Sequence, residues 1–90
     1  MKERTRQLVL KEISKLEDAI SSQSLLKGMG YELEYPDYRG GTYRFYADKV
    51  VNGYQVGATV DRYTSGVSDA LISVYNTTTK ESVIKKTYNS

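Results

Sequence analysis

The chain of 90 residues contains no cysteine, no histidine and no tryptophan, and only one proline and one phenylalanine. Without cysteine there is no disulfide framework and no thiol nucleophile, and without histidine the usual general base near neutral pH is missing. The common zinc site needs one or both of these residues. These absences exclude the usual metalloprotease, deaminase and catalytic-triad classes, so we expect a protein that is not an enzyme and has no cofactor.

Carboxylates are the remaining groups with acid–base or metal-binding chemistry. Glu32 and Glu34 lie two residues apart, which would place both on one face of a strand, but any solvated strand face produces this spacing. The aspartates do not have the spacing of a calcium-binding loop. Gly28 and Gly30 precede a strand instead of following one, which is typical of a turn and not of a dinucleotide site. We therefore expect no catalytic residue and no metal site.

The chain is long enough for a single domain, residues 1–90, with one core. Hydrophobic residues make up 39% and charged residues 27%, which is ordinary for a folded protein. The net charge of +2 is too small to indicate a nucleic-acid partner unless the cations cluster. The apolar run at residues 8–10 is too short for a signal peptide, and none approaches the ~18 residues of a membrane span. We expect a cytoplasmic protein without a membrane partner, or one whose signal was already removed.

Asn52-Gly53 is the strongest local signal in the chain. The dipeptide favours a two-residue type I′ turn, because both central residues need a positive φ that glycine and asparagine tolerate. It therefore predicts a hairpin of strands over residues 42–51 and 54–63. The predicted cross-strand pairs are Val51–Tyr54, Ala47–Ala58, Phe45–Val60 and Tyr43–Arg62 on a largely apolar face, and Tyr46–Thr59 and Arg44–Asp61 on the other.

Apolar residues recur at steps of three and four in the N-terminal segment, at Val9, Ile13, Leu16 and Ile20. On a helix they lie within roughly 60° of one another, which predicts an amphipathic helix over about residues 3–27 with a solvated charged face. Residues 21–24 have poor helix propensity, so we expect a bend or an end there. Alternatively, the helix continues to Lys27 with Gly28 as its C′ residue.

The first strand is expected over residues 31–36, where tyrosine and leucine alternate with glutamate until Pro36 removes a backbone donor. A two-residue turn at Gly40-Gly41 would put the apolar face of this strand on the wrong side of the sheet. The alternative is a three-residue loop with a bulge, which gives the pairs Tyr35–Phe45 and Leu33–Ala47. Because a one-residue slip moves every side chain to the other face, we favour the bulged loop.

The C-terminal third is expected to begin with a mobile loop over residues 63–69. Strands over residues 70–75 and 82–88 then form a last hairpin. We expect Ile72 to face Ile84 in this hairpin, with both side chains toward the core.

The resulting fold class is α+β, with one N-terminal amphipathic helix on one face of an antiparallel meander sheet of four or five strands. A sheet with one apolar face needs cover, and the helix is the only element that can supply it. Cystatin-like folds, with a helix on a curved sheet, resemble this plan. The resemblance is one of architecture, and no sequence motif accompanies it.

The chain has nine tyrosines, whereas average usage would give about three. Tyrosine suits both half-exposed strands and contact surfaces. The register assigns Tyr31, Tyr35, Tyr43 and Tyr54 to the covered face. It leaves Tyr46, Val50, Leu71, Tyr75 and Val83 on or near the open face. These are either scattered surface hydrophobics or a binding surface. Tyr38, Arg39, Arg62 and Tyr63 are expected to form an aromatic and guanidinium cluster. The candidate partner-binding residues are therefore Tyr38, Arg39, Tyr46, Arg62, Tyr63, Leu71, Tyr75 and Val83.

Three functions fit these features. The one we favour is a non-enzymatic protein-binding module, such as a small inhibitor or adaptor of the kind that phages and mobile elements encode. The second is nucleic-acid binding, in which tyrosines stack on unpaired bases and phosphates are bound by Arg39, Arg44, Arg62, Lys85 and Lys86. Its weakness is that carboxylates are interleaved on the same strands. The third is an assembly subunit whose open sheet face or edge pairs with a second copy as a homodimer.

Overall fold

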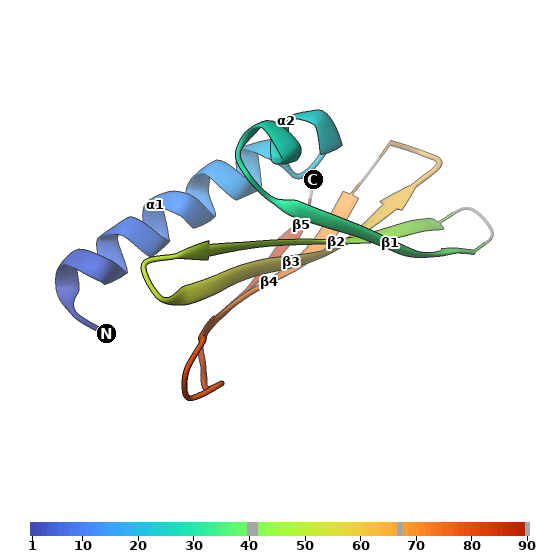
Figure 1. The fold of residues 1–90 in the computed structure, drawn as a ribbon. Coiled ribbons are helices and arrows are strands. Elements are labelled where there is room, and N and C mark those ends of the chain that lie inside the picture. Colours follow the sequence, from blue (N-terminus) through green and yellow to red (C-terminus); the bar gives the residue numbers. More distant parts are fainter. Residues whose placement is uncertain (40–41, 67, 90) are drawn as a thin grey trace.

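Two helices lie on one face of a five-stranded antiparallel sheet in the computed structural model (Figure 1). The structure describes residues 1–39, 42–66 and 68–89, and the side chains of all of these except residues 36–39. The elements are α1 (Glu3–Ala19), α2 (Gln23–Gly28), β1 (Glu32–Arg39), β2 (Thr42–Val51), β3 (Tyr54–Tyr63), β4 (Ser68–Asn76) and β5 (Ser82–Asn89). The strands follow one another in chain order across the sheet. The predicted α+β class, with an N-terminal helix on one sheet face, is confirmed.

The inner face of α1 is the predicted apolar stripe. Val9, Ile13, Leu16 and Ile20 are all buried against the sheet. The helix crosses the strands, because its first turn contacts the β2–β3 turn through Asn52 and its last turn contacts β5. The first contact is a hydrogen bond from Asn52 Nδ2 to Thr5 Oγ1 (2.8 Å), and the second is an ion pair between Lys86 Nζ and Glu17 Oε1 (3.0 Å).

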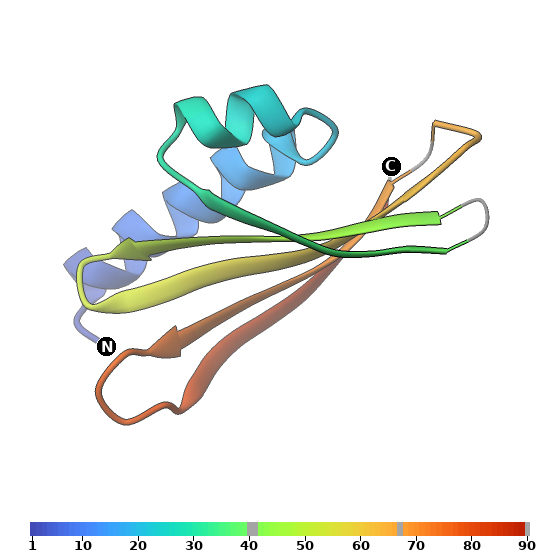
Figure 2. The same cartoon turned by 45° about the vertical axis from the view of Figure 1, so that its right-hand side comes forward.

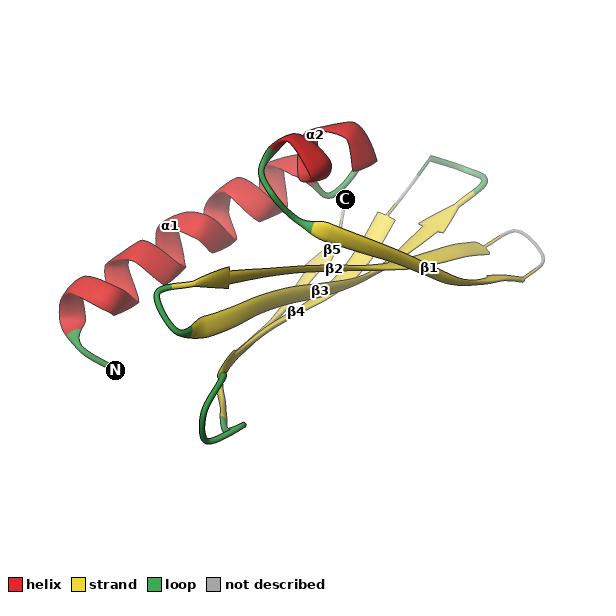
Figure 3. Ribbon diagram, in the orientation of Figure 1, coloured by secondary structure: helices red, strands yellow, loops and turns green. Residues whose placement is uncertain are grey.

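The helical segment breaks at the serines, as one of the two predicted alternatives required (Figure 3). Ser22 caps the new helix, because its side-chain oxygen accepts a hydrogen bond from the backbone N–H of Leu25 (3.3 Å). The prediction of Gly28 as the C′ residue is wrong, since Gly28 is the last residue of α2. Gly30 instead has the left-handed conformation that ends the segment, with a φ of +94°.

The β2–β3 hairpin has the predicted register throughout. Val51 pairs with Tyr54 across the turn, and every cross-strand pair predicted from the sequence is observed. Asn52 and Gly53 both have positive φ, at 51° and 84°, as a type I′ turn requires. The prediction from this dipeptide is therefore confirmed.

The β1–β2 hairpin combines both of the registers considered for it. Leu33 pairs with Ala47, as predicted for the bulged form. Near the turn, however, Arg39 pairs with Thr42, which is the register of a two-residue connection. The predicted three-residue loop is therefore wrong. Gly40-Gly41 themselves lie outside the described residues.

The change of register lies inside β1, between Glu34 and Asp37. Pro36 occupies this interval, and a bulge is one of the few places in a strand that tolerates a residue without a backbone N–H. Tyr35 and Phe45 are consequently not register partners, although their ring centroids lie 6.2 Å apart. The bulge restores the apolar face of the first half of β1 to the helix side.

The β4–β5 hairpin is shifted by two residues from its prediction. Ile72 pairs with Lys86, and Ile84 pairs with Val74. Because the shift is even, the isoleucines still face the helix side, where Ile72 is buried and Ile84 packs against the core. The cause is a bulge next to Val74 together with a longer turn that ends at Lys80, whose φ is +66°. The loop before this hairpin is shorter than predicted, since β3 extends to Tyr63 and β4 begins at Ser68.

The helices cover only one end of the sheet, and the opposite ends of β1, β2, β3 and β4 extend beyond them (Figure 2). Of the tyrosines predicted on the covered face, Tyr31 is buried, and Tyr43 and Tyr54 pack against the core. Tyr35 is 45% exposed, which corrects its assignment to the core. Its ring lies against Tyr43, with centroids 5.8 Å apart.

Candidate functional site

The open face of the sheet, on the side away from both helices, is the candidate site (Figure 1). No described helix or strand covers it. The sequence predicted several large apolar side chains on or near this face, and the structure places Val50, Leu71 and Val83 among its most exposed hydrophobic residues. Leu71, on the fourth strand, is 48% exposed.

Side chains on the open face form rows of cross-strand neighbours. The Leu71 row consists of Glu34, Tyr46, Thr59, Leu71 and Thr87. On one side of it, the Arg44 row consists of Arg44, Asp61, Asp69 and Asn89. On its other side is a polar row of Glu32, Asp48, Gly57, Ser73 and Lys85. The last row contains Val50, Gln55 and Tyr75, with Val83 next to Ser82, the partner of Tyr75.

The polar row divides the apolar side chains of the open face into two groups. Tyr46 and Leu71 lie on one side of it, whereas Tyr75 and Val83 lie on the other. These four residues therefore share a face, as the sequence predicted, but they do not form one continuous apolar patch.

The aromatic and guanidinium cluster expected around the turns is not brought together. Arg62 and Tyr63 are adjacent in β3, so their side chains point to opposite faces of the sheet. Tyr63 lies on the open face, and Arg62 is half-buried on the helix side. The backbones of Tyr38 and Arg39 pair with the start of β2, but their side chains lie outside the described residues.

Arg44 and Asp61 form the most strongly ordered contact of the open face. The guanidinium donates two parallel hydrogen bonds to the carboxylate, at 2.7 Å and 3.1 Å. It also forms a hydrogen bond with Tyr46 in the next row. The hydrogen bonds to Asp61 and the negative charge of Asp61 raise the pKa of Arg44 further. The pair predicted from the hairpin register is thus a bidentate fork, which fixes the position of the arginine side chain.

Asp69 lies directly opposite Asp61 on the neighbouring strand, which places two carboxylates side by side. Arg44 neutralises Asp61, but among the described residues Asp69 forms no ion pair. Its partners are neutral groups: it accepts a hydrogen bond from the hydroxyl of Tyr63, which raises the pKa of that tyrosine. The amide nitrogen of Asn89, when turned toward Asp69, lies 3.0 Å from Oδ1.

A shallow hollow of about 390 Å³ lies over these residues, and we call it the Asp69 hollow. It is lined by Arg44, Thr59, Asp61, Asp69, Ala70, Leu71, Thr87 and Asn89. It therefore combines an oriented carboxylate that has no cationic partner with one exposed aliphatic side chain.

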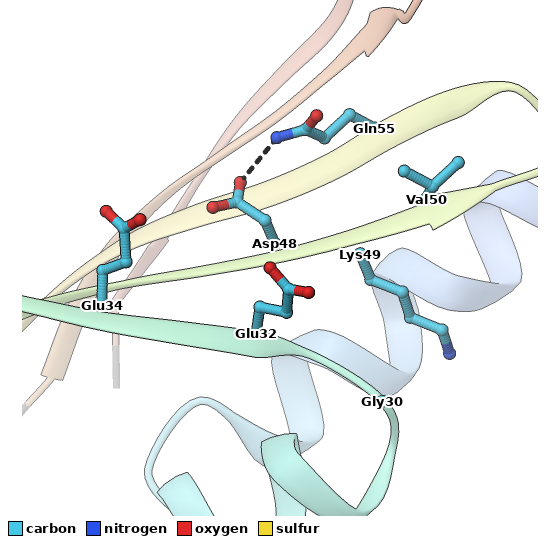
Figure 4. A pocket seen from close by; sticks show the side chains of 7 residues that line it. All are labelled: Gly30, Glu32, Glu34, Asp48, Lys49, Val50 and Gln55. Carbon is cyan, nitrogen blue, oxygen red and sulfur yellow. Dashed lines mark hydrogen bonds between the residues drawn. The ribbon is translucent and has the colours of Figure 1, made fainter.

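A second hollow lies over β1, β2 and β3, where Glu32, Glu34 and Asp48 project from the same side of the sheet (Figure 4). Asp48 accepts a hydrogen bond from Gln55 Nε2 (3.1 Å) and lies across Gly57. A Cβ at Gly57 would be 2.7 Å from Asp48 Oδ1, so glycine makes room for the carboxylate. In the described part of the chain, no group of three or more carboxylates is close enough to hold a metal ion.

Charge is segregated between the two faces of the sheet. The described charged side chains that project to the helix side are all cations, namely Lys49, Arg62 and Lys86. The described side chains of the open face include five carboxylates and two cations, namely Glu32, Glu34, Asp48, Asp61 and Asp69 against Arg44 and Lys85. Together they have a net charge of −3 in a chain whose net charge is +2.

The cations proposed for phosphate binding are divided between the two faces. Arg44 and Lys85 lie on the open face, and Arg44 is already bonded to Asp61. Arg62 and Lys86 lie on the helix side, where Lys86 is paired with Glu17. The described side chains of this set thus form no continuous basic strip along which a phosphate backbone could lie.

Asp69 and Asn89 are the site residues that the sequence analysis did not find. Asp69 was placed at the end of a mobile loop, because the loop composition gave no register between β3 and β4. An alternating pattern that begins at Ser68 is the signal that could have extended the strand.

No described helix is long and apolar enough to span a membrane. No protein family, curated protein or solved structure matches this chain.

Proposed function

We propose that this protein is a small non-enzymatic module that binds another protein through the open face of its sheet. The single observation that supports this most is the exposed Leu71 row, which lies beside the ordered Arg44–Asp61 pair on a face without cover. Exposed apolar side chains next to a fixed arginine are the usual make-up of a protein contact surface.

The arrangement suits binding because little has to be ordered when a partner arrives. The guanidinium of Arg44 is already held in a fork, and Tyr46 is held through its hydrogen bond to Arg44. Strand backbones are rigid supports for side chains such as Leu71. A partner would therefore gain apolar and polar contacts at a low cost in conformational entropy.

We further propose that the module acts in the cytoplasm, as an inhibitor or adaptor. A chain without cysteine suits the reducing cytoplasm, and a small domain with one contact face suits an inhibitor or adaptor of the phage or mobile-element kind. These parts of the proposal rest on composition and size alone.

Site-specific photocrosslinking tests the face directly. A photoreactive phenylalanine analogue at position 71 should form crosslinks to a partner in the source cell. The same analogue at position 25 is the matched control, since Leu25 is 57% exposed on α2, away from the open face. Crosslinks at both positions, or at position 25 alone, would contradict the proposal.

A further inference from the structure

We propose that the partner segment that docks on the open face is cationic, with an arginine or lysine side chain that enters the Asp69 hollow. This inference rests on the proposed function and specifies the chemistry of the partner. It depends on the sign of the charge on this face and on the surroundings of Asp69.

The charge of the open face is opposite in sign to that of the whole chain. Five described carboxylates and two described cations project from it, while the other described charged side chains of the strands are cations on the helix side. Lys49 and Lys86 of that side are paired with carboxylates of α1. Charge complementarity of this kind selects partners and accelerates their encounter.

Among the described carboxylates of this face only Asp61 has a cationic partner, and Asp69 is one of the four without one. It lies opposite Asp61, and like charges directly opposite one another on a sheet are unfavourable. The hydrogen bond from Tyr63 orients this carboxylate, as does that from Asn89 once its amide is turned toward Asp69, but neither neutralises it. A carboxylate can accept about four hydrogen bonds, so acceptor sites remain for a guanidinium or an ammonium group.

Leu71 provides the apolar contact for the proposed basic side chain. It follows Asp69 by two residues on the same face of β4 and lines the same hollow. Arginine and lysine have long apolar stems below a charged head. If the apolar stem of an arginine or lysine lies on Leu71, its charged head lies beside Asp69. Such a side chain fits both the exposed leucine and the carboxylate of the Asp69 hollow.

A second copy of this chain is the main competing occupant. Arg4, Leu8, Lys11 and Lys15 share an exposed stripe on the outer side of α1, opposite its buried stripe. That stripe could dock on the open face of another copy, but the contact is head-to-tail and would produce a ring or an open-ended filament instead of a two-fold dimer. We therefore favour a different protein as the occupant.

A binding titration with peptide probes tests the inference. The probes are a short fluorescein-labelled peptide of arginine, lysine and leucine, and a matched peptide with glutamate at every basic position. We expect fluorescence anisotropy to show saturable binding of the basic peptide only, and about tenfold weaker binding at about 300 mM than at about 50 mM salt.

Charge reversal locates the contact. Asp69→Lys should weaken binding of the basic peptide by about fivefold or more, whereas Asp18→Lys, the same change on the far side of α1, should alter it less than about twofold. Circular dichroism confirms that both variants are folded. Equal loss in both variants, binding of the acidic peptide, or absence of binding at low salt would overturn the inference.

Sedimentation of the protein alone separates the second copy from a foreign partner. Monomers at low salt support the inference. Larger species that are lost both in Asp69→Lys and in a variant with Arg4, Lys11 and Lys15 changed to glutamate would make a second copy the occupant, and would overturn it. Crosslinking at position 71 that persists in Asp69→Lys would sustain the proposed function while removing the cationic contact.

Discussion

Tyr31 shows how one polar contact fixes a helix on a sheet. Its hydroxyl donates to Glu12 Oε2 (3.0 Å), and Lys49 Nζ donates to Glu12 Oε1 (3.2 Å) and lies over the tyrosine ring. Glu12 is only 9% exposed, so its charge needs both partners. These three residues join α1 to the start of β1 and to β2.

Burial, together with the hydrogen bond to Glu12 and the negative charge of Glu12, raises the pKa of Tyr31 above its usual range. The folded protein therefore keeps this proton above pH 10, where the unfolded chain loses it, and the contribution of Tyr31 to stability falls as the pH rises above about 10. We expect Tyr31→Phe to lower the free energy of unfolding by about 1 to 2 kcal/mol at pH 7. This deficit should shrink or reverse by about pH 11.

Urea unfolding at several pH values measures this difference. Comparison with the unsubstituted chain at each pH separates the effect of position 31 from changes that both proteins share. A deficit that stays constant between neutral and strongly alkaline pH would contradict the inferred burial of the hydroxyl.

At the scale of elements, the connection between α2 and β1 depends on which glycine ends the helix. Gly30 has a φ of +94°, which favours glycine, whereas Gly28 is helical and a Cβ there would meet nothing within 4 Å. The two glycines are two residues apart in the sequence, yet only one of them needs its conformational freedom.

Alanine substitutions at these two glycines should have opposite effects. Gly30→Ala should lower the free energy of unfolding by about 1 to 2 kcal/mol, because it forces an L-residue into the left-handed region. Gly28→Ala should raise it by up to about 1 kcal/mol, because alanine is the better helix former. Denaturant titration of the pair measures both, and equal signs would refute the assigned helix end.

On the scale of the whole molecule, one small core supports both the helices and the sheet. Leu16 is completely buried in the core, whereas Leu10 is 43% exposed on the same helix. A domain of this size has a modest total stability. Loss of one large core side chain should therefore lower the stability of every helix and strand.

We expect Leu16→Ala to cost about 2 to 5 kcal/mol, while Leu10→Ala costs less than about 0.5 kcal/mol. Hydrogen exchange should show faster opening of β2, β3 and β4 together with α1 in the Leu16 variant. Opening confined to α1, with unchanged protection of the strands, would show that the sheet is stable without its cover.

The elements with local signals could be predicted from the amino-acid sequence. The apolar stripe of α1 and the Asn52-Gly53 turn depend on spacing and on backbone conformation within a few residues, so helix, hairpin and the register of Arg44 with Asp61 could all be predicted. The burial of the stripe under the sheet followed, because it was the only apolar cover available.

Features that depend on distant or irregular strand pairing became clear only in the folded protein. The bulge at Pro36 and the shifted β4–β5 register arise from how the strands satisfy their backbone hydrogen bonds together. The pairing of Asp61 with Asp69 depends on the β3–β4 register, for which the chain has no local turn signal. The charge of the open face, and with it the candidate site, emerges only when five strands are aligned, because alternation assigns each side chain to a face only after the register is fixed.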